Sequence, residues 1–234
     1  MKNDSGAAPM ECGALLFDMD GVLVDSRAAV ERTWRRWANR HALDPEPILR
    51  IAHGRRTSES LRLAFPHLAV AEEVAWLDAV EMDDLDVTAI PGALSLLSAL
   101  PDFCWTIVTS AGRDLAELRL RRAGLPVPPL IVSSEDVSRG KPAPDGYLAG
   151  AARLRVEPAR AVVIEDAPPG LEAARAAGMR AIALSTTHRA EQLGAAAVIL
   201  PDLTSLHVTI GQEGMVLRFS GEPSPCHGPH PASP

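Results

Sequence analysis

The chain has 234 residues, of which 47% are hydrophobic, so it can bury one substantial core and a small second unit. Its formal net charge of −7 and its pI of about 5.5 exclude the basic surface that nucleic-acid binding requires, so we expect no nucleic-acid partner. No stretch approaches the roughly 18 uninterrupted apolar residues of a membrane span, and no secretion signal opens the chain, so we expect no membrane partner.

The N-terminal half contains one strand followed by a long helical segment. Residues 1–12 are small and polar, and we expect a flexible arm there. The apolar run 14–17 leads into Asp18, Asp20 and Gly21, a pattern typical of a buried strand that carries carboxylates at its end. Asp18 and Asp20 share a side because neighbouring side chains alternate along an extended chain. Two such carboxylates favour a bound cation, although a plain acidic turn is the alternative.

Residues 27–89 form the second predicted unit. The segment 27–41 has apolar residues at helical spacing, so we expect Trp34 and Trp37 to lie in a core and Ser26 to cap the helix. Short amphipathic segments with few β-branched residues follow. Because this helical stretch interrupts an alternation of strands and helices, we interpret residues 27–89 as an inserted helical domain.

The alternation resumes at residue 90 and continues to residue 207. We expect strands over 103–109, 130–133, 161–164 and 180–184, and helices over 92–100, 114–123, 145–154 and 171–177. Short apolar strands between helices predict an α/β fold with a doubly wound, mainly parallel sheet. Residues 13–26 and 90–207 are assigned to this domain, and ligands of such sheets bind beyond the carboxyl ends of the strands.

The predicted alternation ends after residue 207, and we expect residues 208–234 to form an irregular tail. A short strand is possible over 215–219, whereas 221–234 is rich in Pro, Gly and Ser and is expected to be disordered. His227 and His230 are interpreted as solvated residues of this tail and not as metal ligands. The three cysteines, Cys12, Cys104 and Cys226, match no metal-ligand spacing and favour a reducing, cytoplasmic setting.

Three further segments carry polar residues that could bind phosphate or a metal ion. Thr109 and Ser110 end a predicted strand, where a hydroxyl and backbone N–H groups can hold phosphate oxygens, although a helix cap is the simpler interpretation. Lys141 lies between Gly140 and Pro142 on a loop, where its ammonium could neutralise Asp18 and a phosphoryl group. Glu165 and Asp166 end another apolar strand, and acidic residues at two strand ends suit Mg²⁺.

Four short segments lie in order over about residues 15–184: FDMDGVLVDS, VTSAG, RGKPAPDGY and VIEDAPPG. Together they resemble the four motifs of the haloacid dehalogenase-like (HAD) hydrolase superfamily, in the branch with a small helical cap. The resemblance implies that 27–89 is the cap and 13–26 with 90–207 is the core.

The resemblance also implies roles for individual residues. Asp18 is expected to be the nucleophile that becomes aspartyl-phosphate, and Asp20 the general acid and base. Thr109, the Ser110 N–H group and Lys141 are expected to bind the phosphoryl group. Mg²⁺ is the expected cofactor, at a site formed by Asp18, Asp20, Asp166 and, through water, Glu165. Ala167 stands where the family commonly has serine.

The predicted cap contains the sequence HGRRTSESL, in which Arg55 and Arg56 follow Gly54. Guanidinium groups suit oxyanions and sugar hydroxyls, although both arginines could simply be solvated. The loop resembles the specificity loop of capped sugar-phosphate enzymes. Thr57 stands where β-phosphoglucomutase-like sequences have arginine, so the resemblance implies a Mg²⁺-dependent phosphatase of small sugar or polyol phosphates, with a phosphomutase as the alternative.

Two other functions are disfavoured. Dehalogenation does not need the second aspartate, and Asp20 is present. A binding protein without catalysis does not need the complete set of catalytic side chains, and this chain has all of them. We therefore expect a cytoplasmic enzyme, monomeric or weakly dimeric, whose partner is a small phosphorylated metabolite.

Overall fold

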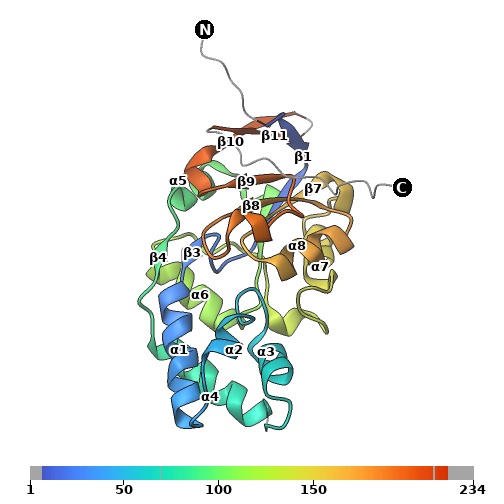
Figure 1. The fold of residues 1–234 in the computed structure, drawn as a ribbon. Coiled ribbons are helices and arrows are strands. Elements are labelled where there is room, and N and C mark those ends of the chain that lie inside the picture. The colour runs from blue at the N-terminus through green and yellow to red at the C-terminus, as the bar shows by residue number, and fades with distance from the viewer. Residues whose placement is uncertain (1–6, 69, 213, 221–234) are drawn as a thin grey trace, which may run out of the picture.

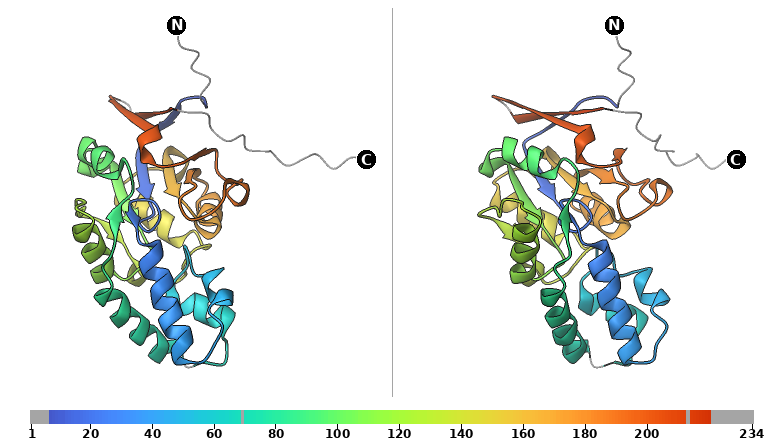
Figure 2. Two further views of the ribbon diagram at one scale, coloured as in Figure 1. Left: turned by 60° about the vertical axis from the view of Figure 1, so that its left-hand side comes forward. Right: turned by 90° about the vertical axis from the view of Figure 1, so that its left-hand side faces the viewer.

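The computed structural model describes residues 7–68, 70–212 and 214–220. These residues form three parts stacked along one axis (Figure 1): a helical cap at one end, an α/β core in the middle and a small antiparallel sheet at the other end. Two further views show the cap helices below the core sheet and the small sheet above it (Figure 2). Within the described ranges, no helix has the length and apolar content needed to cross a membrane.

The core is a parallel sheet of six strands in the order β6-β5-β2-β7-β8-β9, which confirms the predicted doubly wound fold. The strands are β2 (Ala14–Phe17), β5 (Trp105–Val108), β6 (Ile131–Val132), β7 (Ala161–Glu165), β8 (Arg180–Leu184) and β9 (Val198–Leu200). The core helices are α5 (Ala93–Ala99), α6 (Arg113–Arg122), α7 (Asp145–Arg153) and α8 (Pro168–Ala176). Strand β9 had not been predicted.

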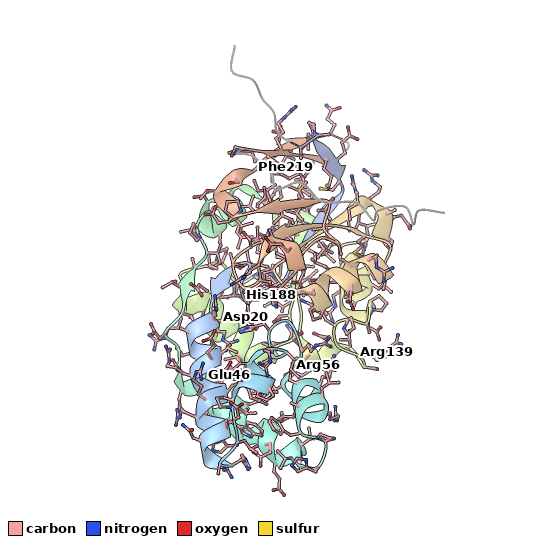
Figure 3. The ribbon with its side chains drawn as sticks, in the orientation of Figure 1. Asp20, Glu46, Arg56, Arg139, His188 and Phe219 are labelled. Atoms are coloured by element: carbon pink, nitrogen blue, oxygen red, sulfur yellow. The ribbon has the colours of Figure 1, made fainter. Side chains whose placement is uncertain are left out.

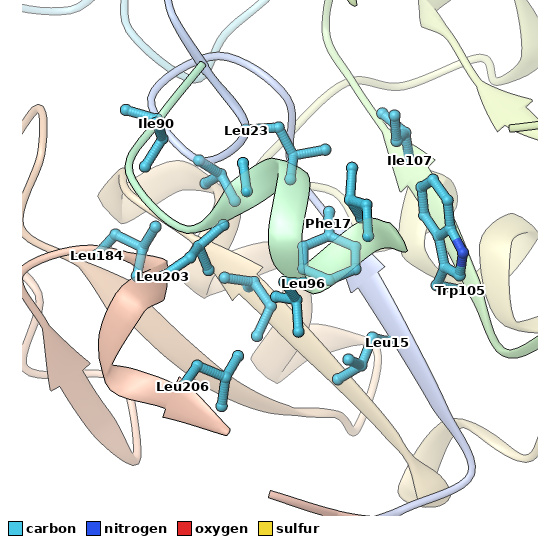
Figure 4. Close-up of a cluster of buried hydrophobic side chains, with 14 of the residues drawn as sticks. Leu15, Phe17, Leu23, Ile90, Leu96, Trp105, Ile107, Leu184, Leu203 and Leu206 are labelled. Carbon is cyan, nitrogen blue, oxygen red and sulfur yellow. The ribbon is translucent and has the colours of Figure 1, made fainter. Parts of the chain in front are cut away.

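Strand β2 lies in the middle of the sheet and is buried on both sides. Leu15 and Phe17 pack with Leu96 of α5 on one face, as the cluster in Figure 4 shows. Leu16 points to the other face, where Tyr147 of α7 is buried. A strand covered by helices on both faces needs an unbroken apolar run, and this explains the sequence ALLF.

The cap consists of α1 (Arg27–Arg40), α2 (Glu46–Leu49), α3 (Thr57–Ala64) and α4 (Val70–Asp83). It has its own apolar core, which contains Trp34 and Trp37 as predicted, together with Leu61 and Leu77. The two chain crossings between core and cap pair with each other as β3 (Val24–Asp25) and β4 (Thr88–Ala89). The predicted capping role of Ser26 is wrong, because its hydroxyl makes no cap hydrogen bond and bonds to Asp20.

The two ends of the described chain meet in an antiparallel sheet of order β1-β11-β10, formed by β1 (Met10–Cys12), β10 (Leu206–Gly211) and β11 (Gly214–Phe219). The predicted arm is therefore wrong at residues 10–12, and the predicted irregular tail is wrong at 208–211, whereas β11 confirms the short strand predicted over 215–219. Met10, Leu217 and Phe219 are buried in this sheet, and pairing between segments distant in the sequence provides that burial. Phe219 lies at the end of the molecule opposite the cap (Figure 3). Residues 221–234, with His227 and His230, lie outside the described residues.

Candidate active site

Asp18 is held at the carboxyl end of β2, next to the end of β7. Its backbone N–H donates to the carbonyl of Ile164 at 2.9 Å, so the residue continues the pairing between these strands. The chain then turns at Gly21, which has a φ of +80°. A Cβ at this position would overlap the carboxylate of Asp166, so glycine allows the acidic ends of β2 and β7 to come together.

Lys141 links the first and last motifs. Its Nζ lies 2.5 Å from Oδ1 of Asp18 and 2.7 Å from Oε1 of Glu165, and all three side chains are buried. Burial lowers the pKa of Lys141, but the two carboxylates outweigh it and raise that pKa above its ordinary value. The lysine therefore stays protonated and holds positive charge against the buried carboxylate of Asp18.

Both carboxylate oxygens of Glu165 are occupied by hydrogen bonds, one of them from Lys141. Besides Lys141, its Oε1 accepts a hydrogen bond from the hydroxyl of Tyr147 at 2.9 Å. Its Oε2 accepts from the N–H groups of Asp166 and Ala167 at 2.8 and 3.0 Å. Burial raises the pKa of Glu165, but Lys141 and these donors lower it overall, so the carboxylate is ionised.

Asp18, Glu165 and Asp166 form a buried group with carboxylate oxygens within 4.8 Å of one another. Burial, together with the neighbouring carboxylates, raises the pKa of Asp18 to about 7 against the opposing charge of Lys141, and raises the pKa of Asp166 well above its ordinary value. Oδ1 of Asp166 has no hydrogen-bond partner among the described residues. One ammonium cannot balance three buried carboxylates, so this donor set fits a cation such as Mg²⁺.

Asp20 faces the boundary between core and cap (Figure 3), and its carboxylate does not belong to that group of three. Its Oδ1 accepts hydrogen bonds from the hydroxyl of Ser26 at 2.6 Å and from Nη1 of Arg119 at 3.0 Å. The side chain is 29% exposed, which leaves it accessible from the cavity described below. Its position suits proton transfer better than direct binding of a metal by its side chain.

Thr109 and Ser110 lie where β5 ends, beside Asp18. Oγ1 of Thr109 accepts a hydrogen bond from the Ala111 N–H at 3.1 Å, which stabilises the turn before α6. The Ser110 hydroxyl donates to the carbonyl of Gly54 in the cap at 3.2 Å. Both residues border the same cavity as Asp18.

The two cap arginines lie in different surroundings. Arg55 borders the cavity that contains Asp18 and Asp20. Arg56 instead donates from Nη2 to the carbonyl of Val137 at 2.9 Å and from Nη1 to that of Ser138 at 3.4 Å. Arg56 thus joins the cap to the loop that precedes Lys141, and the predicted substrate role is compatible with the position of Arg55 only.

A cavity that is partly open to solvent lies between core and cap. Asp18, Asp20, Thr109 and Asp166 border it from the core side. The cap contributes the apolar Val30 and Trp34 and the polar His53, Arg55, Thr57 and Glu81. A small molecule with both apolar edges and hydroxyl or phosphate groups can be enclosed there.

The family model described as haloacid dehalogenase-like hydrolase matches residues 12–178. The chain belongs to the haloacid dehalogenase-like hydrolases. It is 41% identical to hexitol phosphatase A of Escherichia coli (strain K12), over 89% of this chain and 99% of that protein. It is 33% identical to glycerol-1-phosphate phosphohydrolase 2 of Saccharomyces cerevisiae, over 76% of each chain.

Among solved structures, a hydrolase from Pseudomonas syringae superposes with a TM-score of 0.73 and 28% identity, over 82% of this chain and 94% of that one. These HAD relatives and the site geometry agree on the class of activity. The chain is an enzyme of the phosphoric monoester hydrolase class.

Three residues of this HAD site were not predicted from the sequence. Tyr147, the single tyrosine of the chain, ends the stretch RGKPAPDGY, and this position was a usable signal. Arg119 and Glu81 meet at 3.5 Å across the boundary between core and cap. Neither gave a signal, because α6 is rich in arginine and α4 is rich in acidic residues.

Proposed function

We propose that this enzyme is a Mg²⁺-dependent phosphatase that hydrolyses small sugar or polyol phosphates through an aspartyl-phosphate on Asp18. The observation that carries the proposal is the placement of Asp18 at the cavity floor, held by Lys141 at 2.5 Å and close to the unpartnered oxygen of Asp166. A carboxylate fixed in this way can attack a phosphorus atom that enters from the cavity.

In the first step, a carboxylate oxygen of Asp18 attacks the phosphorus atom, and the bond from phosphorus to the ester oxygen breaks. Asp20 gives its proton to that oxygen, so the sugar or polyol leaves as a neutral alcohol. The cavity borders both carboxylates, so one bound substrate can reach the two groups together.

In the second step, Asp20, now ionised, takes a proton from a water molecule, whose oxygen attacks the phosphorus. The bond between phosphorus and Asp18 breaks, which releases inorganic phosphate and restores the carboxylate of Asp18. Asp20 regains its proton in this step, so both groups are ready for another turnover.

Positive charge and N–H donors stabilise the phosphoryl group during both steps. Lys141 supplies a buried ammonium, and Thr109 and the N–H group of Ser110 border the cavity at the end of β5. Asp18 and Asp166 would hold Mg²⁺, with Glu165 beside them, and the bound ion would offset negative charge on the transferring group.

The cap supports the proposed substrate class. Arg55 and Thr57 offer hydrogen bonds to hydroxyl groups at the side of the cavity opposite the core. Two of the related proteins are named for hexitol and glycerol phosphates, which are polyol esters, and another is named for 2-deoxyglucose-6-phosphate, a sugar ester. A hexitol or glycerol phosphate would place its phosphate at Asp18 and its hydroxyls at the cap.

The test is a phosphate-release screen of the purified enzyme with Mg²⁺, using hexitol, glycerol, hexose and nucleotide monophosphates. We expect the highest kcat/KM for a polyol or sugar phosphate. Product analysis would separate hydrolysis from transfer, since a phosphomutase leaves the phosphate on the sugar. Isomerised sugar phosphate without free phosphate would contradict the proposal.

We also infer a reducing compartment such as the cytoplasm. Cys12 and Cys104 are both buried, free thiols among the described residues. Burial raises the pKa of Cys12 to about 11, which keeps this thiol protonated and unreactive. Neither cysteine has the disulfide role that is common in secreted proteins.

A further inference from the structure

We propose that Arg119 is a positioning residue that fixes Asp20 in place and ties it to Glu81 of the cap, so that substrate enclosure and placement of the proton donor occur together. This inference rests on the proposed function, because it needs Asp20 to act as the general acid. It assigns a role to two residues outside the four HAD motifs.

The first observation is the burial of Arg119 at the domain boundary. The residue extends from α6 of the core, and only 2% of its surface is exposed. Its Nη1 donates to Oδ1 of Asp20 at 3.0 Å, and its Nη2 lies 3.5 Å from Oε2 of Glu81. A guanidinium group is flat and has several fixed donors, so it can orient two carboxylates at once.

The second observation is that Arg119 has spare hydrogen-bonding capacity. Its Nε and Nη2 have no hydrogen-bond partner among the described residues, although both are buried. The contact with Glu81 is therefore an ion pair without a hydrogen bond. A small movement of α4 toward α6 would complete it, and these two helices already pack against each other (Figure 2).

The third observation is the position of Glu81 in the cap. It lies on α4, has a side chain only 12% exposed, and borders the cavity together with Asp20 and Arg119. Burial raises its pKa, while the charge of Arg119 opposes that change. A buried carboxylate needs a charged partner, and Arg119 is the cation that faces it.

Ser26 completes the arrangement around Asp20. Its hydroxyl donates to the same Oδ1 that Arg119 contacts, so two donors hold this oxygen and the remaining oxygen, Oδ2, can point toward the substrate. Without Arg119, Ser26 would be the remaining donor to this oxygen among the residues that the structure describes. Proton transfer requires heavy atoms within hydrogen-bond reach, so a loosely held Asp20 would protonate the leaving oxygen less often.

The test compares leaving groups that differ in basicity and carry no hydroxyls for the cap to bind. We would measure kcat/KM for a series of aryl phosphates from p-nitrophenyl to phenyl phosphate. This parameter covers the first step only and is independent of later hydrolysis of the aspartyl-phosphate. Phenolate is the poorer leaving group and depends more on protonation by Asp20.

We expect Arg119→Met to lower kcat/KM for phenyl phosphate by roughly 10- to 100-fold more than for p-nitrophenyl phosphate. Arg119→Lys, which keeps one charge but not the two-sided fork, should recover part of the loss. Glu81→Gln should also lower kcat/KM for phenyl phosphate more than for p-nitrophenyl phosphate, by a smaller factor than Arg119→Met. Arg121→Met is the matched control, because Arg121 lies on the same helix, is exposed, and among the described residues forms its ion pair with Glu117.

The wild type and Asp20→Asn define the limits of the series. Suppose that kcat/KM of Asp20→Asn falls steeply from p-nitrophenyl to phenyl phosphate, while kcat/KM of Arg119→Met falls no more steeply than that of the wild type. The positioning role is then wrong and the proposed function stands. If kcat/KM of the wild type depends on the leaving group as steeply as that of Asp20→Asn, Asp20 is not the proton donor, and both proposals fail. If Arg119→Met does not fold, Arg119→Lys and Glu81→Gln decide by the same criterion.

Discussion

Oε1 of Glu59, on cap helix α3, lies 3.0 Å from the backbone nitrogen of Gly140, the residue that precedes Lys141. Arg56 contacts the same loop through the carbonyls of Val137 and Ser138. The cap therefore contacts the loop that presents the ammonium group of Lys141. Arg55, next in the chain to Arg56, faces the substrate cavity instead.

This difference predicts different effects for the two arginines. Arg55→Ala should lower kcat/KM for the best polyol phosphate by about 10- to 100-fold, the equivalent of one charged hydrogen bond, and should leave p-nitrophenyl phosphate almost unchanged. Arg56→Ala should lower kcat/KM for both substrates by similar factors, because it loosens the contact with the Lys141 loop. Steady-state kinetics with the two substrates checks this, and a substrate-selective loss in Arg56→Ala would contradict it.

Replacement of the nucleophile should abolish turnover without unfolding the enzyme. Asp18→Asn changes one oxygen for an amide, and we expect phosphate release to fall by about a thousandfold or more. Circular dichroism would establish that the fold is intact. Asp25→Asn, an exposed aspartate on β3, is the control and should keep wild-type activity. Retention of more than a few per cent of turnover by Asp18→Asn would rule out the covalent mechanism.

Removal of metal should inactivate the enzyme reversibly. We expect a chelator to abolish phosphate release, Mg²⁺ to restore it, and Ca²⁺ to fail because its larger, looser coordination misplaces the attacking carboxylate. Mg²⁺ should also raise the Tm of the wild type, since it binds only the folded site. Asp166→Asn should lose most of that increase in Tm. Full activity in excess chelator would refute the metal assignment.

Gly170 should tolerate no side chain. A Cβ there would overlap Oε1 of Glu165, which is already held by Lys141 and Tyr147. We expect Gly170→Ala to reduce the free energy of unfolding by about 1–3 kcal/mol and to lower kcat, because Glu165 must shift. Gly194→Ala is the control, since a Cβ at Gly194 meets no atom within 4 Å. Urea denaturation of both variants measures the difference, and equal stability would contradict the prediction.

Asp136 should make stability depend on pH in acid. Partial burial raises its pKa, but hydrogen bonds from Arg153 and Ser133 outweigh that effect and hold the pKa well below its usual range. A depressed pKa in the folded state stabilises the protein above the unfolded-state pKa of about 3.9, and this contribution is lost as the pH falls further.

Asp136→Asn should therefore lower the urea midpoint near neutral pH and have a smaller effect at about pH 3. The comparison needs urea melts of the wild type and the variant at both pH values. Asp83→Asn, at the exposed end of α4, serves as the control. A difference between wild type and Asp136→Asn that grows toward acid pH would contradict the assignment.

The sequence by itself determined the core fold and most of the residues in the proposed catalytic group. Apolar runs at 14–17 and 161–164 end in carboxylates, and a local pattern of this kind depends only on neighbours in the chain. The resemblance of four short motifs to HAD hydrolases then related Lys141 to Asp18, although the two residues are 123 positions apart.

Only the tertiary structure decided which residues meet across the domain boundary. Arg55 and Arg56 are chemically identical neighbours, and only the packing of the cap directs one to the cavity and the other to the Lys141 loop. Arg119 is one of several arginines on α6, and burial between Asp20 and Glu81 distinguishes it from the rest. The sheet of β1, β10 and β11 likewise depends on pairing between chain ends, and no local pattern records such long-range contacts.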